Sequence, residues 1–326
     1  MQKTSLTPFL SIVIPSRANN LSLLEQILGC LAQQTFQDFE VLIVCDRDFT
    51  DQERETFQST LFSFVNFPNK DKKIRLFSHQ NADFVPHHQG GASYVRNFGI
   101  KHAQGVYLQL FDDDNEFDAD YLEKILKFHK QFTKKYQKEV VITPTLMRRN
   151  TDRIQNQGFS EYNYWLARPC INFLKSDQEF AEIKMFSGNG IFAKTSIMQQ
   201  VLYDEEIAWI AEDLDFVYSM RELGFPILVF KALKIRHQER DKTYLEEARI
   251  GNQYSAQQKI KNLFLRVKKH GNLFQTLIFL CWSSWWICVW LGLKAFFHGW
   301  SEKRKIICGL IKGYCNGWRI LIWKNK

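Results

Sequence analysis

The chain has 326 residues, of which 45% are hydrophobic and 15% aromatic, and its formal net charge is +8. This apolar content, with 16 Gly and 7 Pro, excludes wholesale disorder and a collagen-like architecture. The length allows one large domain with an appendage or two medium domains. The seven cysteines form no CxxC pair, so we expect reduced thiols on the cytosolic side and no structural zinc site.

The charge is divided unevenly along the chain. Residues 251–326 contain 13 Lys and Arg, a single acid, Glu302, and seven of the nine tryptophans. Residues 1–250 are therefore mildly acidic. Because the basic residues of the tail alternate with apolar and aromatic ones, we expect its partner to be a membrane surface and not nucleic acid.

Strand and helix patterns alternate through the first half of the chain. A short apolar run closed by Pro15 predicts a strand over 10–14, and apolar residues three or four positions apart predict a helix over 21–32. The same two patterns predict, in order, a strand over 39–45, a helix over 50–64, a strand over 73–77, a helix over 91–103, a strand over 106–111, a helix over 119–136 and a strand over 139–143. Such alternation predicts an α/β fold with a mostly parallel sheet and helices on both faces.

The patterns are weaker after this point. Residues 150–185 are irregular and aromatic, and we interpret them as an excursion that faces the substrate. Regular structure is expected again over 186–193, followed by a helix over 213–223 and a strand over 227–230.

Acidic residues follow two of the predicted strands, at the edge of a parallel sheet where ligands bind. Asp46 ends the second strand, and Asp112, Asp113 and Asp114 follow the strand over 106–111. Side chains two residues apart in an extended segment point the same way, so Asp112 and Asp114 are expected to converge. Two carboxylates suit Mg²⁺ or Mn²⁺ bound to phosphate oxygens. An isolated cluster of this kind is more often a solvated acidic turn, but its register with Asp46 favours a metal site.

A second acidic pair, Glu212 and Asp213, precedes the helix predicted over 213–223. A carboxylate here can accept a proton from a bound hydroxyl group, and Asp213 is the candidate base. Asp215 is the competing acid, and its position two residues further along a helix points it elsewhere. The alternative for the pair is an ordinary helix N-cap.

Three further features have open roles. His237, after the last strand, would complete a metal shell or contact phosphate, although a lone histidine is more often structural. Arg96 lies on the helix before the acidic strand and would hold phosphate or pair with the acids. Gly188 and Gly190 would allow a ligand close to the backbone, or form a turn.

Taken in order, these segments resemble the inverting family 2 glycosyltransferases, which have the GT-A fold. The matching segments are Ser11-Ile-Val-Ile-Pro-Ser-Arg17, Gln33-Gln-Thr-Phe36, Glu40-Val-Leu-Ile-Val-Cys-Asp46, Gly91 to Gly99, Phe111-Asp-Asp-Asp114, Gly188-Asn-Gly-Ile-Phe-Ala-Lys194 and Glu212-Asp-Leu-Asp215. They cover about residues 8–240. No single motif is specific, but their order is.

The resemblance implies a metal-dependent transfer of a sugar from a nucleoside diphosphate to an acceptor hydroxyl, with inversion. Asp112 and Asp114, with His237, would bind Mn²⁺ or Mg²⁺ between the protein and the diphosphate. Asp213, beside Glu212, would deprotonate the acceptor. The residues that would hold the donor nucleotide are Pro15, Ser16, Arg17, Asp46, Arg96 and Asp113.

The uneven charge, together with the extent of the resemblance, divides the chain into a catalytic domain over 1–250 and a basic, Trp-rich helical tail over 251–326. The nucleotide-binding half of the domain would occupy about 8–115, and the acceptor half about 116–250. We expect a glycan or lipid-linked acceptor and a role in surface polysaccharide or glycolipid synthesis.

The tail contains one long uncharged segment, residues 272–293. As a helix it would extend roughly 33 Å, enough to cross a bilayer. Basic residues flank both ends, so the positive-inside rule gives a single span no direction, and an interfacial or re-entrant segment would keep both flanks at the cytosolic leaflet. We predict membrane association from the cytosolic side, at a depth that the sequence leaves open. The alternative is a helical hairpin buried against the domain or in an oligomer interface.

Two other functions compete with sugar transfer. A nucleotidyltransferase would share the sheet and the acids, but the loop Pro15-Ser-Arg-Ala-Asn-Asn20 lacks the glycines such enzymes usually place there. A catalytically silent membrane scaffold that only binds a sugar nucleotide is the third hypothesis.

Overall fold

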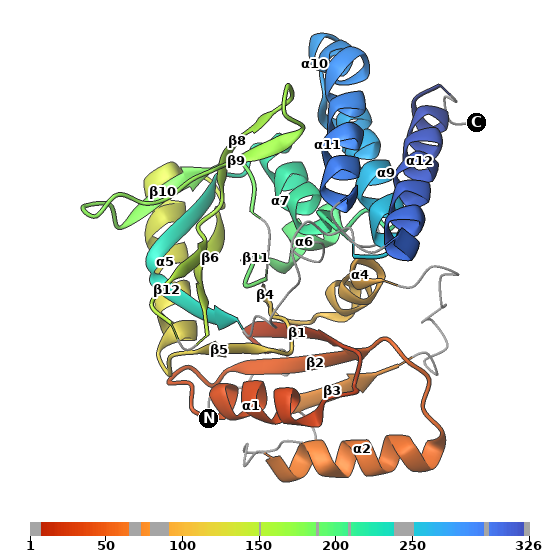
Figure 1. The fold of residues 1–326 in the computed structure, drawn as a ribbon. Helices are drawn as coiled ribbons and strands as arrows, with labels where there is room; N and C mark the ends of the chain where they lie inside the picture. The colour runs from red at the N-terminus through yellow and green to blue at the C-terminus, as the bar shows by residue number, and fades with distance from the viewer. Residues whose placement is uncertain are drawn as a thin grey trace, which may run out of the picture.

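The computed structural model describes residues 8–64, 73–78, 91–149, 151–186, 189–207, 210–237, 251–296 and 300–322. These residues form a large mixed sheet, a separate two-stranded hairpin and helices packed around both (Figure 1). The strand order in the sheet is β10-β12-β6-β11-β4-β1-β2-β3. Gly188, where a turn or close backbone approach was expected, lies outside the described residues.

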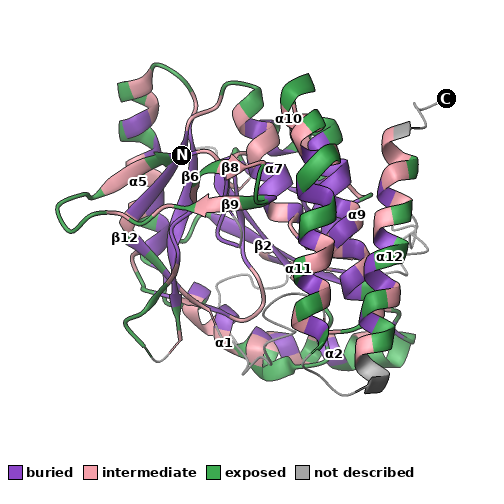
Figure 2. Cartoon of the chain, turned by 45° about the horizontal axis from the view of Figure 1, so that its top comes forward, coloured by how far each residue is buried: buried purple, intermediate pink, exposed green. Residues whose placement is uncertain are grey.

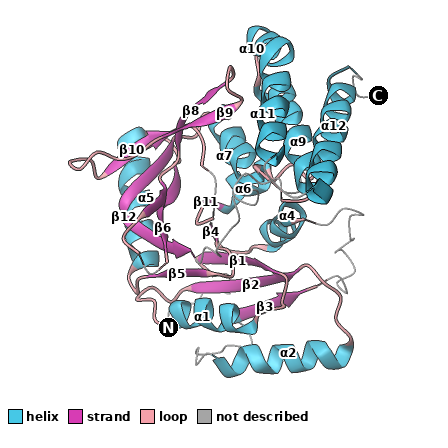
Figure 3. Cartoon of the chain, viewed as in Figure 1, coloured by secondary structure: helices cyan, strands magenta, loops and turns pink. Residues whose placement is uncertain are grey.

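The N-terminal half of the sheet is parallel. Its strands are β1 (Leu10–Ser16), β2 (Phe39–Cys45), β3 (Ile74–Phe77) and β4 (Tyr107–Leu110). Helices α1 (Leu21–Ala32) and α2 (Asp51–Phe64) lie on one side, and α4 (Ala92–His102) lies on the other (Figures 1 and 3). Both faces of β2 are buried along its whole length, which explains why its sequence is apolar without alternation.

The C-terminal half of the sheet is mixed. It contains β5 (Asn115–Phe117), β6 (Val141–Arg148), β7 (Ile154–Asn156), β10 (Phe180–Ile183), β11 (Phe192–Lys194) and β12 (Ile227–His237). Strands β6 and β12 are parallel, whereas β11 runs antiparallel between β4 and β6. The helices of this half are α5 (Tyr121–Tyr136), α6 (Thr195–Val201) and α7 (Glu212–Glu222). The predicted α/β fold with a mostly parallel sheet is confirmed.

Two segments differ from their sequence patterns. The stretch expected to be irregular contains β7, β10 and the hairpin of β8 (Phe159–Asn163) and β9 (Arg168–Ile171). These strands are short and partly exposed, so their sequences lack the alternation that marks a half-buried strand. Strand β12 continues well beyond Phe230, because after an irregularity at 231–233 it pairs again with β6.

The first helix of the tail, α9 (Gln253–His270), is joined to the catalytic domain by hydrogen bonds. The Lys261 ammonium donates to the carbonyl oxygen of Glu206 at 2.9 Å, and the Asn262 side chain donates to that of Ile210 at 3.0 Å. The predicted boundary near 250 therefore precedes a helix that is part of the domain surface.

The other tail helices pack on α9. They are α10 (Leu273–Ile278), a π-helical turn η1 (Phe279–Ser283), α11 (Ser284–Phe296) and α12 (Trp300–Ile322). Gly309, Gly313 and Gly317 bring α12 close to α9, since a Cβ atom at Gly313 would lie 2.5 Å from the carbonyl oxygen of Gln257. A second hydrophobic core forms between these helices, separate from the core of the sheet.

The continuous helix Leu273–Phe296 has 24 residues, and its most apolar stretch has a mean hydropathy of 1.7, which makes it long and apolar enough to cross a membrane. One side is buried in the second core through Phe279, Ile287, Leu291 and Ala295. Only 28% of its most apolar stretch is buried, and the opposite side is exposed (Figure 2). The helix therefore has one packed face and one open apolar face.

Candidate functional site

The three consecutive aspartates form a tight turn between β4 and β5. The Asn115 side chain closes this turn, because its Oδ1 atom accepts a hydrogen bond from the Asp112 backbone N–H at 3.1 Å. Asp112 and Asp114 converge as the sequence predicts. The sequence pattern predicts that the two residues lie in an extended segment. In the structure the two side chains converge because residues 113–114 form a turn.

Asp112, Asp114 and His237 form a group that fits a divalent cation. One ligand atom from each lies within 4.8 Å of the others. His237 is the last residue of β12, and its Nε2 atom lies 3.2 Å from Asp114 Oδ2. Two carboxylates and one imidazole suit Mn²⁺, and the carboxylates alone suit Mg²⁺. The register between β12 and β5 creates the group by placing His237 opposite Asn115.

Asp113 points toward the end of β1 and not toward the metal group. Its Oδ2 atom accepts a hydrogen bond from the Ser16 hydroxyl at 2.6 Å, while the Ser16 carbonyl accepts one from the Asp46 backbone N–H at 2.8 Å. Burial raises the pKa of Asp113 to about 6, against the opposing effect of the Ser16 hydrogen bond. The ends of β1, β2 and β4 therefore meet, as expected for one site.

Arg96 lies at the centre of the acidic residues. Its side chain is buried, and its guanidinium nitrogens lie 2.9 Å from Asp112 Oδ1, 3.2 Å from Glu212 Oε1 and 3.4 Å from Asp213 Oδ1. Of the two roles the sequence left open, pairing with acids is thus the observed contact, and binding of phosphate stays a prediction. One cation joins acids from two distant parts of the chain.

Asp112 is held in its ionised form. Burial alone would raise its pKa, but Arg96 and a hydrogen bond from the Asn189 amide at 2.9 Å outweigh that effect and lower it. Asn189 precedes Gly190, whose φ of +85° and close contact with Pro144 exclude a larger residue. Asn189 was not predicted as a site residue, although it lies in a motif that the resemblance included.

Asp213 lies in the first turn of α7, and its side chain is 13% exposed. Its Oδ1 atom accepts a hydrogen bond from the Tyr203 hydroxyl at 3.3 Å. Burial raises its pKa to about 7; Arg96 opposes this rise and Glu212 adds to it. The carboxyl group can therefore exchange a proton near neutral pH.

The backbone before this acidic pair is strained. Ile210 and Ala211 both have positive φ angles, 70° and 68°, although neither is glycine. Such residues cost of the order of 1 kcal/mol or more each and are often found at functional sites. The Asn262 side chain of α9 holds the Ile210 carbonyl, so the tail supports the strained turn.

Asp215 faces away from the site, as predicted. Its two oxygens lie 2.6 Å from Lys269 Nζ and 2.7 Å from His270 Nε2, both at the end of α9. Side chains two residues apart in an α-helix differ in direction by about 200°, so Asp213 and Asp215 lie on opposite sides of α7. Asp215 fixes the tail helix to the domain.

The remaining predicted residues lie around this cluster. Pro15 is half-buried at the end of β1, and Arg17 is exposed in the following loop. The sequence patterns do not identify Asn115 and Tyr203 as site residues. Asn115 accepts a hydrogen bond from the Asp112 N–H and Tyr203 donates one to Asp213, and no sequence pattern indicates these contacts.

The fold agrees with a GT-A architecture. S. aureus TarS residues 1–349, solved in complex with UDP-GlcNAc, superposes with a TM-score of 0.56 and 13% identity, covering 94% of this chain and 81% of that one. This similarity supports the fold alone.

A family model described as glycosyl transferase family 2 matches residues 11–201. The chain therefore belongs to this family. It is 35% identical over 121 residues to an uncharacterized glycosyltransferase of Haemophilus influenzae, covering 37% of this chain and 42% of that protein. It is 23% identical over 270 residues to the putative colanic acid biosynthesis glycosyl transferase WcaA of Escherichia coli, covering 82% of this chain and 86% of that protein.

Proposed function

We propose that this protein transfers a sugar from a nucleoside-diphosphate sugar to an acceptor hydroxyl, with inversion, in synthesis of a surface polysaccharide or glycolipid. One observation carries the proposal: Asp112 and Asp213 contact the same buried guanidinium, that of Arg96. A donor-binding acid and a candidate base thus share one site. The relative named for colanic acid biosynthesis supports the class of product.

The donor would lie over the carboxyl ends of β1, β2 and β4. Ser16, Asp46 and Asp113 meet there, and we assign them, with Pro15 and Arg17, to the nucleotide. Asp112, Asp114 and His237 would hold Mn²⁺ or Mg²⁺. When bound, the cation would stabilise the negative charge of the departing nucleoside diphosphate.

Asp213 would accept the proton of the acceptor hydroxyl. A base in a single displacement must lie on the acceptor side, and desolvation raises the pKa of the Asp213 carboxyl group to about 7. The Tyr203 hydroxyl and Arg96 orient the carboxyl group, while Glu212 shares the charge of Arg96. Because one displacement occurs, the anomeric configuration inverts.

The tail would bind a membrane through its exposed apolar side. The exposed residues of the helix are Leu273, Phe274, Leu277, Trp282, Trp285, Trp286, Trp290, Leu293 and Phe296. The turn of the β8–β9 hairpin lies against the buried side of this helix, because the Ser283 hydroxyl donates to the carbonyl oxygen of Trp165, and the Trp165 side chain is also exposed. Lys294 and Lys303 lie over the Trp290 and Phe296 rings, beside the apolar surface, as binding to anionic lipid requires.

The other side of this helix is part of the second core, and leaving that core would expose buried residues of α9. We therefore propose an interfacial helix on the cytosolic leaflet and not a separated span. This position would bring the site to a lipid-linked or otherwise membrane-near acceptor.

The rate of transfer is expected to rise with pH and to level off above about 7. A general base acts in its ionised form, and burial raises the pKa of Asp213 to about 7, so the active form is gained as pH rises through that value. The measurement is kcat/KM at saturating metal from about pH 5.5 to 9, with donor binding followed over the same range. A rate that is flat or falls between about pH 6 and 8 would contradict this assignment.

Replacing Trp282 and Trp285 with Ser should weaken binding to anionic vesicles by about tenfold to a hundredfold for each residue, because each exposed indole would lose its burial in lipid. Co-sedimentation with phosphatidylglycerol vesicles measures the effect. Val106→Ser, which changes a similarly exposed apolar residue just before β4, is the control. Unchanged binding of the Trp variants would refute the membrane surface. Removal of residues 272–326 is a weaker test, since it also uncovers the apolar side of α9.

A donor screen tests the whole proposal. Purified protein, membranes and a panel of nucleotide sugars are incubated with Mn²⁺ or Mg²⁺, and release of nucleoside diphosphate and formation of glycan are recorded. Transfer that chelation abolishes supports the proposal. Donor binding without transfer from any donor would instead favour the silent scaffold, and release of pyrophosphate from nucleoside triphosphates would favour a nucleotidyltransferase.

A further inference from the structure

The loop between α6 and α7 leads directly into the candidate base. Ile210 and Ala211 are its last residues, and α7 begins at Glu212. Asp213 therefore follows at once on a backbone turn in which two successive φ angles are positive. Because a helix continues in the direction of its first turn, this backbone turn sets where the Asp213 carboxyl group lies.

This turn needs support from its surroundings. The left-handed region is unfavourable for residues other than glycine, and for a β-branched residue such as Ile210 most of all. Such a conformation persists only where neighbouring groups fix it. The neighbouring group here is the Asn262 amide of α9, which donates to the Ile210 carbonyl oxygen at 3.0 Å. Asn262 is 1% exposed, so water does not compete for this hydrogen bond.

The start of the same loop is fixed by a different helix, α4. The Ser93 hydroxyl donates to the Ile207 carbonyl oxygen at 2.8 Å, and the Asn97 amide donates to that of Tyr203 at 2.8 Å. The loop thus has one support from within the sheet-forming part of the catalytic domain and one from the tail. The support from the tail is the one at the strained end.

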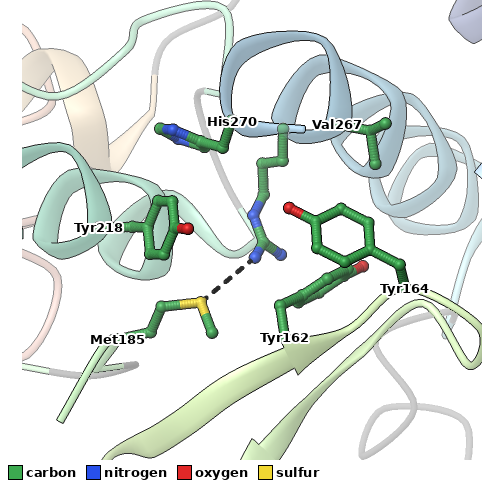
Figure 4. Close-up of a pocket in the computed structure, with 7 residues that line it drawn as sticks. Tyr162, Tyr164, Met185, Tyr218, Val267 and His270 are labelled. Carbon is green, nitrogen blue, oxygen red and sulfur yellow. Dashed lines mark hydrogen bonds between the residues drawn. The ribbon is translucent and has the colours of Figure 1, made fainter. Parts of the chain in front are cut away.

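Helix α9 is itself firmly seated against the domain. One turn beyond Asn262, the Arg266 guanidinium lies over the Tyr162 ring of β8 at 4.8 Å and donates to the Met185 sulfur at 3.8 Å. These side chains line a small pocket at the junction of α7, α9 and the β8–β9 hairpin, together with Tyr218 of α7 (Figure 4). Arg266 is 8% exposed, so its stem and guanidinium fill this junction.

The last turn of α9 holds α7 through charged groups. Lys269 Nζ lies 2.6 Å from Asp215, and the His270 ring lies 2.7 Å from both Asp215 and Glu222. Positions 262, 266, 269 and 270 follow helical spacing, so all these contacts lie on one face of α9. Asn262 therefore projects from a helix that is fixed at several points, which is the rigidity that positioning requires.

We propose that Asn262 is a positioning residue for the general base: through the Ile210 carbonyl it holds the turn that directs Asp213 toward the acceptor hydroxyl. The inference rests on the proposed function, because it takes Asp213 as the base. Asn262 acts through the backbone and not by contact with the reacting groups. The helix that precedes the proposed membrane surface is thereby part of the catalytic unit.

Asn262→Ala should lower the rate of sugar transfer by about 10- to 100-fold, because a misplacement of about 1 Å at a reacting group has an effect of this size. Affinity for the nucleotide sugar found in the donor screen should stay within about threefold of wild type, because the donor contacts lie at the strand ends. Single-turnover transfer and equilibrium binding, both with the full chain, separate the two effects. A hydrogen bond that only stabilised the fold would lower the thermal midpoint without this split.

Gln199→Ala is the control. The Gln199 amide also joins two elements by donating to a backbone carbonyl oxygen, that of Ile100, at 3.1 Å. This variant should transfer sugar at the wild-type rate. If Asn262→Ala does not fold, Asn262→Ser takes its place, since the serine side chain ends before the position of the amide nitrogen and leaves room for water. The same loss of transfer is expected.

Ala211→Gly tests the link to the strained turn. Glycine adopts positive φ angles readily, so the turn of this variant depends less on the hydrogen bond from α9. Ala211→Gly alone should transfer sugar within about threefold of wild type. The fold loss that Asn262→Ala causes should be at least about threefold smaller in the Ala211→Gly chain than in the wild-type chain.

Three results would overturn the positioning role. They are transfer by Asn262→Ala within about threefold of wild type, an equal fold loss in the wild-type and Ala211→Gly chains, and a parallel loss of donor affinity and rate. Failure of this inference and failure of the proposed function remain distinguishable. Slow transfer by Asp213→Asn with normal transfer by Asn262→Ala would refute the positioning role alone, whereas normal transfer by Asp213→Asn would remove the base on which both depend.

Discussion

Asp213→Asn should lower the rate of sugar transfer by about 10²- to 10⁴-fold and leave donor binding within about threefold of wild type. Asparagine has nearly the same shape and can still accept a hydrogen bond from the Tyr203 hydroxyl, but it cannot take a proton from the acceptor. The donor contacts of the strand ends are untouched, because Asp213 lies on α7. Single-turnover transfer and equilibrium binding of the nucleotide sugar measure the two effects separately.

Asp120→Asn is the control for this experiment. Asp120 also lies at the start of a helix, α5, but its side chain is 45% exposed, and Lys124 is its one ion-pair partner among the described residues. It should transfer sugar at the wild-type rate. If Asp213→Asn turned over within about threefold of wild type, Asp213 would not be the base.

Arg96→Met should destabilise the fold by about 3–5 kcal/mol, the range seen when one partner of a buried ion pair is removed. Asp112, Glu212 and Asp213 would keep their burial and lose their shared cation. Transfer should be lost as well. Chemical denaturation measured at two pH values tests the electrostatic origin of the effect.

The pH dependence has a definite sign. Without Arg96, desolvation would leave the pKa values of Asp112 and Asp213 in the folded protein above those in the unfolded chain, so the folded state would bind more protons and its stability would fall as pH rises. The deficit should therefore be larger at about pH 8 than at about pH 5.5. Arg75→Met, which removes one of three donors to Glu40, should cost less, because the Ser11 hydroxyl and the Gln104 N–H still donate to that carboxylate. A small, pH-independent loss for Arg96→Met would show that the acids do not depend on this cation.

Helix α9, the first helix of the tail, packs on the catalytic domain as part of its structure. Helix α9 holds the Ile210 carbonyl, binds Asp215 and supplies Arg266 to the pocket beside α7. Sequence composition separates this helix from the domain, because its basic residues resemble those of the later tail. Its contacts connect the proposed membrane surface to the turn that carries Asp213.

The order of strands and helices could be predicted because it depends on local periodicity. The buried run of β2 and the helical spacing of α1 are complete in their own sequences, so the parallel sheet and the position of Asp46 and Asp112 at one edge follow from them. The different orientations of Asp213 and Asp215 also follow from helix geometry alone. The apolar character of the helix over 273–296, which carries no charge before Lys294, follows from composition alone.

Tertiary structure alone determined which groups meet. Arg96 contacts three acids from two distant segments, and no spacing in the sequence distinguishes that arrangement from a pair or from a phosphate contact. His237 reaches Asp114 because β12 continues past an irregularity that its sequence does not mark. The buried guanidinium of Arg266 likewise results from packing between α9 and the hairpin, since a helical pattern gives the direction of a side chain and not the atoms that surround it.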